Sequence, residues 1–263
     1  MSASKSNGKS HQRPVIINRS DYKKIPLDIR ELGDDVREIA ENVYSGDILS
    51  IDWHGSIPRG DFVFGESDAD ITIFIGHNFE SGHREKREKL LRDILPKWQN
   101  RGVCKLDVIA VPKPEFHKDA RRNGLFFTES DGIFLPGFPR LDFSYTLPKT
   151  NLELVEILNR YFKLWILDAR NNIPELTKSQ IYQQVWKRTY RAIYGLAILD
   201  GAPYEQNWRS YPKFIKEYTP QYTETIQQLL YEKAVPLDTI IEIGKNTYEQ
   251  LEKFGIKFMT NWN

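Results

Sequence analysis

Strand-like runs occur only in the first half of this sequence, and this restriction is the strongest constraint on its fold. Apolar runs of strand length lie at residues 47–53, 70–75 and 105–111, and the run at 70–75 is rich in β-branched side chains. Such runs are typical of strands buried on at least one face. The segments 22–44 and 83–99 instead repeat their apolar residues at helical spacing. The first half therefore predicts a small mixed sheet with helices.

The second half shows only the helical period. Apolar and aromatic residues recur at helical spacing over 154–165, 181–199 and 240–251, and a further helical pattern lies around 214–230. No convincing strand follows residue 150, so this part predicts a helical bundle. We therefore expect an α+β protein in which a small mixed β-sheet domain is followed by an α-helical bundle domain.

The domain boundaries follow from the same patterns. Residues 1–20 are polar and lack apolar periodicity, so we expect a flexible N-terminal tail. Residues 21–149 form the predicted sheet domain and residues 150–263 the helical domain. Within the first, residues 124–148 hold strand fragments, and the part from 132 to 148 contains five Pro and Gly residues. We interpret 124–148 as a connector to the helical domain.

Composition excludes several classes of protein. The 263 residues are 40% hydrophobic and 28% charged, as in an ordinary globular protein. The net charge of +1 gives no overall field that would recruit nucleic acid or a membrane. A single cysteine, Cys104, excludes a disulfide framework and suits a reducing cytoplasm. No run of 18 apolar residues is present, so no membrane span is expected, and the polar N-terminus does not resemble a signal peptide.

The segment from His54 to Gly60 has the residues of a phosphate-binding turn. Gly55 allows a sharp turn and a close approach of the backbone to a ligand. Ser56 adds a hydroxyl beside backbone N–H groups, an arrangement that suits phosphate oxygens. Arg59 could supply positive charge to the same polyphosphate, although a surface arginine is the alternative interpretation. We interpret His54 itself as a packed side chain at a strand end.

Three aspartates indicate a site for two metal ions. Asp68 and Asp70 lie one residue apart at a strand start, so their carboxylates are expected on one face. Asp107 lies inside the next apolar strand, where a charged residue needs a reason; a buried salt bridge is the alternative. Carboxylates this close favour Mg²⁺ bound together with substrate phosphates. Their convergence is typical of two-metal phosphoryl transfer, with one ion at the attacking hydroxyl and the other at the triphosphate and leaving pyrophosphate.

The order of these elements resembles the DNA polymerase β-like nucleotidyltransferase superfamily. The matching pattern is Gly55-Ser56, an arginine, Ser67-Asp68-x-Asp70 and a third acid on a later strand, and it spans residues 48–111. The second half is similar in layout to the helical domain of streptomycin/spectinomycin-type aminoglycoside adenylyltransferases. The segments that carry this second resemblance are Asp131–Gly137, Tyr194-Gly195, Gly201-Ala202-Pro203, Asn207-Trp208 and residues 218–222.

The resemblance assigns roles to the motif residues. Asp68 and Asp70 would bind both metal ions, and Asp107 would bind one of them and help to deprotonate the acceptor hydroxyl. Gly55 and Ser56 would hold the phosphates of the nucleotide, with Ser67 and Arg59 as further nucleotide-binding residues. ATP is the usual donor, two Mg²⁺ ions are the cofactors, and the acceptor would sit between the two domains.

The acceptor divides the functional hypotheses. The first is a Mg²⁺-dependent adenylyltransferase acting on a hydroxyl-bearing small molecule, such as an aminoglycoside-like antibiotic. The second is a toxin-type or regulatory enzyme that modifies tRNA or a protein. The third, a degenerate fold that only binds nucleotide, is disfavoured because all three carboxylates are present. Residues 151–263 hold 14 Lys and Arg against 13 Asp and Glu. They therefore show neither the acidic excess expected for a polycation nor a basic stripe for RNA.

Overall fold

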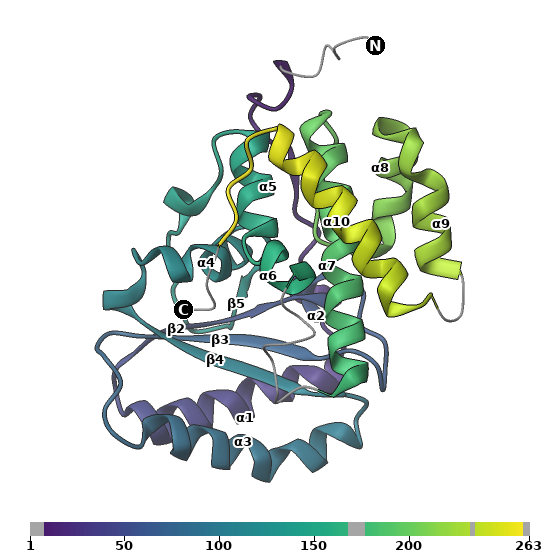
Figure 1. Ribbon diagram of the computed structural model, residues 1–263. Coiled ribbons are helices and arrows are strands. Elements are labelled where there is room, and N and C mark those ends of the chain that lie inside the picture. Colours follow the sequence, from purple (N-terminus) through teal and green to yellow (C-terminus); the bar gives the residue numbers. More distant parts are fainter. Residues whose placement is uncertain (1–7, 168–176, 232–234, 260–263) are drawn as a thin grey trace. The chain divides into compact units, whose positions relative to one another are not determined.

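The structure is a computed structural model that describes residues 8–167, 177–231 and 235–259 (Figure 1). The chain divides into two compact units, one formed by residues 18–147 and the other by residues up to 17 together with those from 148 onward. No helix in the described parts is long and apolar enough to cross a membrane. The predicted α+β class, with a small mixed sheet and a helical unit, is confirmed.

The first unit is built on a four-stranded sheet with the strand order β4-β3-β2-β5. β2 is antiparallel to both β3 and β5, whereas β3 and β4 are parallel. The bounds of its elements are α1 Leu27–Tyr44, β2 Ile48–His54, α2 Ser56–Arg59, β3 Ala69–Ile75, α3 His83–Gln99, β4 Leu106–Pro112, α4 Asp119–Asp131 and β5 Ile133–Phe134. The three strands predicted from apolar runs are thus all present, within two residues of their expected ends.

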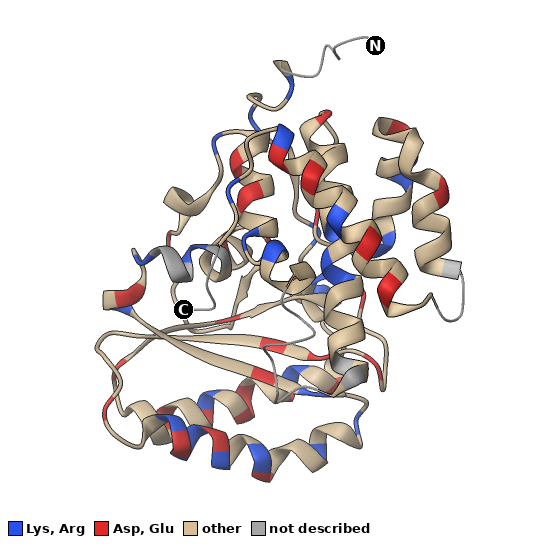
Figure 2. Ribbon diagram, viewed as in Figure 1, with Lys and Arg blue, Asp and Glu red and all other residues tan. Residues whose placement is uncertain are grey.

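Helices α1 and α3 cover one face of this sheet (Figure 1). Alternate strand residues such as Ile71 and Ile73 point to that face and are fully buried. The α1 residues Leu32 and Val36 and the α3 residue Trp98 pack in the same core. Figure 2 shows acidic and basic residues interleaved along the ribbons of α1 and α3, as expected for a solvated helix face.

The opposite face of the sheet divides into an aromatic end and a polar end. Phe74, Val111, Leu125 and Phe143 form a small core at the aromatic end. Toward the other end the same face carries polar residues on each of the three long strands. Because β-strand side chains alternate between faces, the apolar residues facing α1 and α3 leave these polar positions facing the other way.

The stretch predicted to be a connector is instead part of the first unit. Residues 119–131 form α4, and Ile133–Phe134 form the edge strand β5, which pairs with Trp53 and Asp52 of β2. The connector hypothesis was wrong because residues 124–131 and 133–134 belong to α4 and β5, and the Pro and Gly residues from 136 to 139 lie in the irregular stretch that follows within the same unit. The division of the chain falls after residue 147.

The second unit is mainly helical. Its helices are α5 Asn151–Asn159, α6 Phe162–Leu167, α7 Lys178–Leu199, α8 Tyr211–Tyr218, α9 Thr223–Tyr231 and α10 Leu237–Lys253. The single helix predicted over 154–165 is two helices, α5 and α6. The structure also contains a strand after residue 150, because β1 (Ile16–Ile17) pairs in parallel with β6 (Tyr204–Glu205).

Residues 8–17 pack on the helical unit, whereas the sequence predicts a flexible tail. Ser10 is buried, and its carbonyl oxygen accepts a hydrogen bond from the Leu152 N–H at 2.9 Å. The Gln12 carbonyl oxygen accepts from the Asn151 N–H at 2.8 Å. These contacts are made by backbone groups, so the side-chain pattern of this segment could not predict them. Residues 1–7 of the predicted tail lie outside the described residues.

Candidate active site

Three polar residues stand side by side across the sheet. His54 of β2 is the register partner of Asp70 of β3, which in turn is the register partner of Asp107 of β4. We call these three residues the polar row. Paired residues on neighbouring strands project to the same face, so the two carboxylates expected to converge are neighbours. Asp68 lies immediately before β3 and is half-buried.

The charge environment of Asp70 favours a bound cation. Burial raises the pKa of the Asp70 carboxyl, and the negative charges of Asp107 and Asp68 raise it further, while His54 and Arg59 oppose that shift. A carboxylate that is buried beside like charges is stabilised by a cation placed between them. The oxygen donors of Asp68, Asp70 and Asp107 fit Mg²⁺, which binds to carboxylates together with substrate phosphates.

The carboxylates are not drawn into a closed metal cage. In the described residues, no group of three or more His, Cys, Asp and Glu is arranged to hold a metal ion. Asp107 has a half-exposed side chain, and its Oδ2 lies 3.3 Å from the Lys105 Nζ. Asp107 is therefore not the buried salt-bridge partner that the alternative interpretation required, and its carboxylate is open to solvent. Such an open set of ligands matches a metal that arrives with phosphate oxygens as further ligands.

The turn after β2 lies against Asp70. Gly55 has φ +81° and ψ −151°, a conformation that is essentially restricted to glycine. A Cβ atom at this position would lie 2.2 Å from Asp70 Oδ2. The backbone of the predicted phosphate-binding turn and the predicted metal-binding carboxylate are thus in contact. Ser56 begins α2 directly after this turn and is half-buried.

Arg59 is a buried clamp rather than a surface residue. Its Nη1 lies 2.6 Å from Asp131 Oδ2, its Nε donates to Asp61 Oδ2 at 3.0 Å, and only 10% of the side chain is exposed. Ser20 donates its hydroxyl to the other Asp131 oxygen at 2.7 Å. Burial raises the pKa of the Asp131 carboxyl, and the Arg59 guanidinium acts against that rise. These bonds tie α2 to the end of α4.

Ser67 closes the turn that precedes Asp68. Its Oγ accepts a hydrogen bond from the Val63 N–H at 2.9 Å, and its N–H donates to the Val63 carbonyl at 2.9 Å. Its own carbonyl accepts from the Cys104 N–H, just before β4, at 2.9 Å. Ser67 therefore holds the loop that precedes Asp68. Its Oγ accepts a hydrogen bond within this loop, and its hydroxyl proton could be donated to a nucleotide.

Two residues beside the predicted site were not recognised from the sequence. Asp52 is fully buried, and its Oδ2 lies 3.7 Å from Nδ1 of His54. Burial alone lowers the pKa of His54, but Asp52, Asp70 and Asp131 together raise it above its ordinary value. The available signal was the alternation of Asp52 and His54 with Ile51 and Trp53, since a charged residue within an apolar strand needs a reason.

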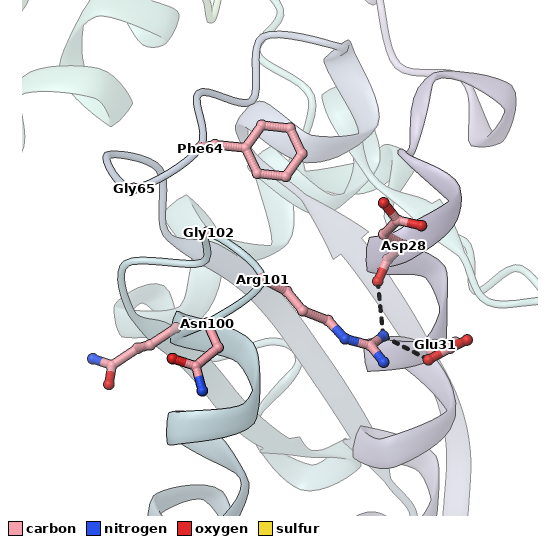
Figure 3. Close-up of a pocket in the computed structure, with 8 residues that line it drawn as sticks. Asp28, Glu31, Phe64, Gly65, Asn100, Arg101 and Gly102 are labelled. Carbon is pink, nitrogen blue, oxygen red and sulfur yellow. Dashed lines mark hydrogen bonds and ion pairs between the residues drawn. The ribbon is translucent and has the colours of Figure 1, made fainter.

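A separate pocket of about 720 Å³ contains none of these residues (Figure 3). It lies between the start of α1, the turn at Phe64 and the end of α3, and Arg101 in it is ion-paired with Glu31 at 2.6 Å. The Gly65 N–H donates to the Gly102 carbonyl at 2.7 Å across it. The hydrogen bond from Gly65 holds the loop that leads to Asp68, and the pocket itself is separate from the predicted active site.

We compared the chain with protein families, curated proteins and solved structures, and only the solved structures gave matches. No protein-family model and no curated protein matches the chain. A spectinomycin adenyltransferase AAD(9) from Enterococcus faecialis, crystallised with ATP and spectinomycin, matches at a TM-score of 0.58 and 10% identity. The match covers 84% of this chain and 98% of that one. A nucleotidyltransferase-like protein from Exiguobacterium sibiricum 255-15 matches at a TM-score of 0.30 and 14% identity, covering 84% and 74% of the two chains, and this score is too low for an argument. The chain has the nucleotidyltransferase fold.

Proposed function

We propose that this protein is a nucleotidyltransferase that moves AMP from ATP to a hydroxyl group of a small molecule. The observation that carries the proposal is the polar row together with the Gly55 turn. Asp70 has Asp107 as its register partner on one side and touches the glycine turn on the other. A metal-binding carboxylate is therefore adjacent both to a third acid and to a backbone that can receive phosphates.

Each residue of the site has a proposed part. Asp68, Asp70 and Asp107 would hold two Mg²⁺ ions, which supply Lewis-acid stabilisation of the charge on the phosphates. The turn at Gly55 and Ser56 binds the triphosphate, with the Ser67 hydroxyl as a further donor. Arg59 is ion-paired on both sides, so we assign it the task of orienting this turn.

In the proposed transfer, the acceptor hydroxyl displaces pyrophosphate from the α-phosphorus of ATP. The acceptor oxygen forms a bond to the α-phosphorus, and the bond from that phosphorus to the bridging oxygen breaks. The electron pair leaves with pyrophosphate, and Asp107 takes the proton of the acceptor hydroxyl. Asp107 suits this part because its carboxylate is half-exposed and reaches solvent.

The choice of a small acceptor is supported by the structural neighbour, which was crystallised with ATP and spectinomycin. The helical unit would then take part in holding the acceptor. The near-neutral charge of residues 151–263 gives no support to a strongly cationic acceptor, so a small hydroxylated molecule of low charge fits better than a polycation. Modification of tRNA or of a protein is the second hypothesis.

The test is transfer of label from [α-³²P]ATP in the presence of Mg²⁺. Streptomycin, spectinomycin, tRNA and the protein itself serve as acceptors in parallel reactions. We expect label on a hydroxylated small molecule, and no label when Asp68→Ala or Asp70→Ala replaces the wild type. Label on tRNA or on protein alone would contradict the small-molecule acceptor. Full activity in either variant would contradict the metal-binding assignment.

A further inference from the structure

His54 and Asp52 form a pair at the end of β2 that has no role in the reaction proposed above. They lie two residues apart on β2 and therefore project to the same face of the sheet. Asp52 is fully buried, and 20% of the His54 side chain is exposed. The pair reaches the active site through His54, which is the register partner of Asp70.

The buried pair is held together by charge rather than by a formed hydrogen bond. Both Asp52 oxygens and the His54 Nδ1 are buried and have no hydrogen-bond partner in the described structure. The separation of 3.7 Å between Asp52 Oδ2 and His54 Nδ1 is within ion-pair range and beyond a hydrogen bond. A fully buried carboxylate without donors is costly unless it acts on a nearby cation. The imidazole of His54 is the nearest such group on the same strand.

The Asp52 oxygen that faces His54 is also enclosed by the chain at Gly132. A Cβ atom at Gly132, at the end of α4, would lie 2.6 Å from Asp52 Oδ2. The carboxylate is therefore packed against backbone and cannot turn to solvent. A carboxylate in this position orients an imidazole through Nδ1 and leaves Nε2 to face a ligand.

We propose that His54 is a substrate-contacting residue that donates a hydrogen bond from Nε2 to an oxygen of the triphosphate. This inference rests on the proposed function. His54 directly precedes Gly55, the residue whose backbone touches Asp70, and it is also the register partner of Asp70, so it stands beside the turn assigned to the phosphates. Asp52 is a positioning residue in this arrangement, since it acts only through His54.

The chemical consequence concerns the departing pyrophosphate. Negative charge accumulates on the bridging oxygen as its bond to the α-phosphorus breaks. A charge-assisted donor that is already oriented stabilises this charge without reorganisation. The ligand recognised by His54 is thus a nucleoside triphosphate or pyrophosphate, and a nucleoside monophosphate lacks the oxygens that it would contact.

The experiment compares two isosteric replacements of His54. A glutamine amide nitrogen can occupy the position of Nε2, whereas an asparagine amide nitrogen occupies that of Nδ1. Affinities for ATP and for AMP are measured by isothermal titration calorimetry with Mg²⁺ on the full chain. We expect His54→Asn to weaken ATP binding roughly 10- to 100-fold, the effect of one charged hydrogen bond, and His54→Gln to weaken it less. AMP affinity should stay unchanged in both variants.

His77→Asn is the matched control. His77 also pairs with an aspartate, with 2.6 Å between Nδ1 and Asp47 Oδ1, but 89% of its side chain is exposed. Its ATP affinity should equal that of the wild type. Asp52→Asn, which leaves the ring in place, should show part of the His54→Asn loss and provides a second readout.

The outcomes separate this inference from the proposed function. Wild-type protein without Mg²⁺-dependent ATP binding would overturn the proposed function and this inference with it. Wild-type protein that binds ATP, with His54→Asn binding it equally well, would overturn the role of His54 alone. Equal losses of ATP affinity in the Asn and Gln variants, or parallel losses for ATP and AMP, would indicate a structural role and overturn it as well.

Discussion

At the scale of single residues, the site consists of charges that the fold holds close together. Asp70 is one such charge, because burial and the carboxylates of Asp107 and Asp68 all disfavour its ionised form. The charge of Arg59 is instead stabilised, since it is ion-paired with the carboxylates of Asp61 and Asp131. The two residues are therefore expected to respond in opposite directions when their charge is removed.

Asp70→Asn should stabilise the metal-free protein. The substitution keeps the shape of the side chain and removes a buried charge that repels its neighbours. We expect the free energy of unfolding in EDTA to rise by about 1 kcal/mol, the usual gain from relieving a strained active-site residue. Urea denaturation measures it, with the exposed Asp34→Asn as a control that should change little. A less stable Asp70→Asn protein would contradict the charge conflict.

Arg59→Met should have the opposite effect. It leaves Asp131, which has only 3% of its side chain exposed, without its guanidinium partner. Breaking a buried ion pair on one side costs about 3–5 kcal/mol. Arg84→Met is the matched control, because Arg84 pairs with Glu88 on the exposed face of α3 and such solvent-exposed pairs contribute little to stability. Equal denaturation midpoints for the two variants would show that Arg59 is not a clamp.

The sequence predicted the carboxylates Asp70 and Asp107 but not the partners of His54 and Arg59. Asp70 and Asp107 stand out because each interrupts an apolar strand, and the structure makes them register partners. The same reasoning applied to Asp52 would have indicated a second buried charge, but only the structure shows that His54 faces it. The partners of Arg59 could not be predicted, because Asp131 is 72 residues away in the chain.

At the scale of elements, the site depends on how β2 ends. The strand delivers His54, and Gly55 then turns the chain into α2 against the Asp70 carboxylate. Long apolar strands and the helices α1, α3, α7 and α10 were predictable from periodicity. α4 was not, because residues 119–124 are mostly polar and hide the helical pattern. A two-residue strand such as β5 exists only through pairing with β2.

Gly55→Ala should disable nucleotide binding. The new Cβ would impose an unfavourable backbone conformation and would also displace the Asp70 carboxylate, only 2.2 Å away. Gly46→Ala is a close control, because Gly46 has a similar φ of +78° and no atom within 4 Å of an added Cβ. Gly46→Ala should lose about 1–2 kcal/mol of stability from its positive φ, and Gly55→Ala should lose more because its conformation is less accessible to alanine and its Cβ meets Asp70. Only Gly55→Ala should lose Mg²⁺-dependent ATP binding in calorimetry, and retention of binding would contradict the contact.

At the scale of the whole molecule, the chain crosses between its units twice. The segment up to residue 17 belongs to the helical unit although the sheet unit follows it in sequence. This arrangement escaped sequence analysis because residues 8–17 are held by backbone hydrogen bonds, such as that from the Tyr204 N–H to the Val15 carbonyl at 2.7 Å.

Removal of residues 1–17 should therefore weaken the helical unit selectively. The lost backbone bonds to Asn151, Leu152 and Tyr204 contribute about 1 kcal/mol each, so this unit should lose about 3 kcal/mol. Hydrogen exchange followed by mass spectrometry can locate the effect. Amides in 148–263 should exchange faster, while those of α1 and β3 keep their protection. Uniform loss in both units, or no loss, would contradict the assignment of this segment.

The central claim is that Asp68, Asp70 and Asp107 form one site for two metal ions with a nucleoside triphosphate. Counting bound Mn²⁺ by electron paramagnetic resonance, in the presence of the non-cleavable α,β-methylene-ATP, tests it without an acceptor. We predict about two ions per wild-type chain, as in two-metal phosphoryl-transfer sites, and a clear loss of bound ions in Asp70→Asn. Absence of bound Mn²⁺ in the wild type, or an equal number in the variant, would contradict the account.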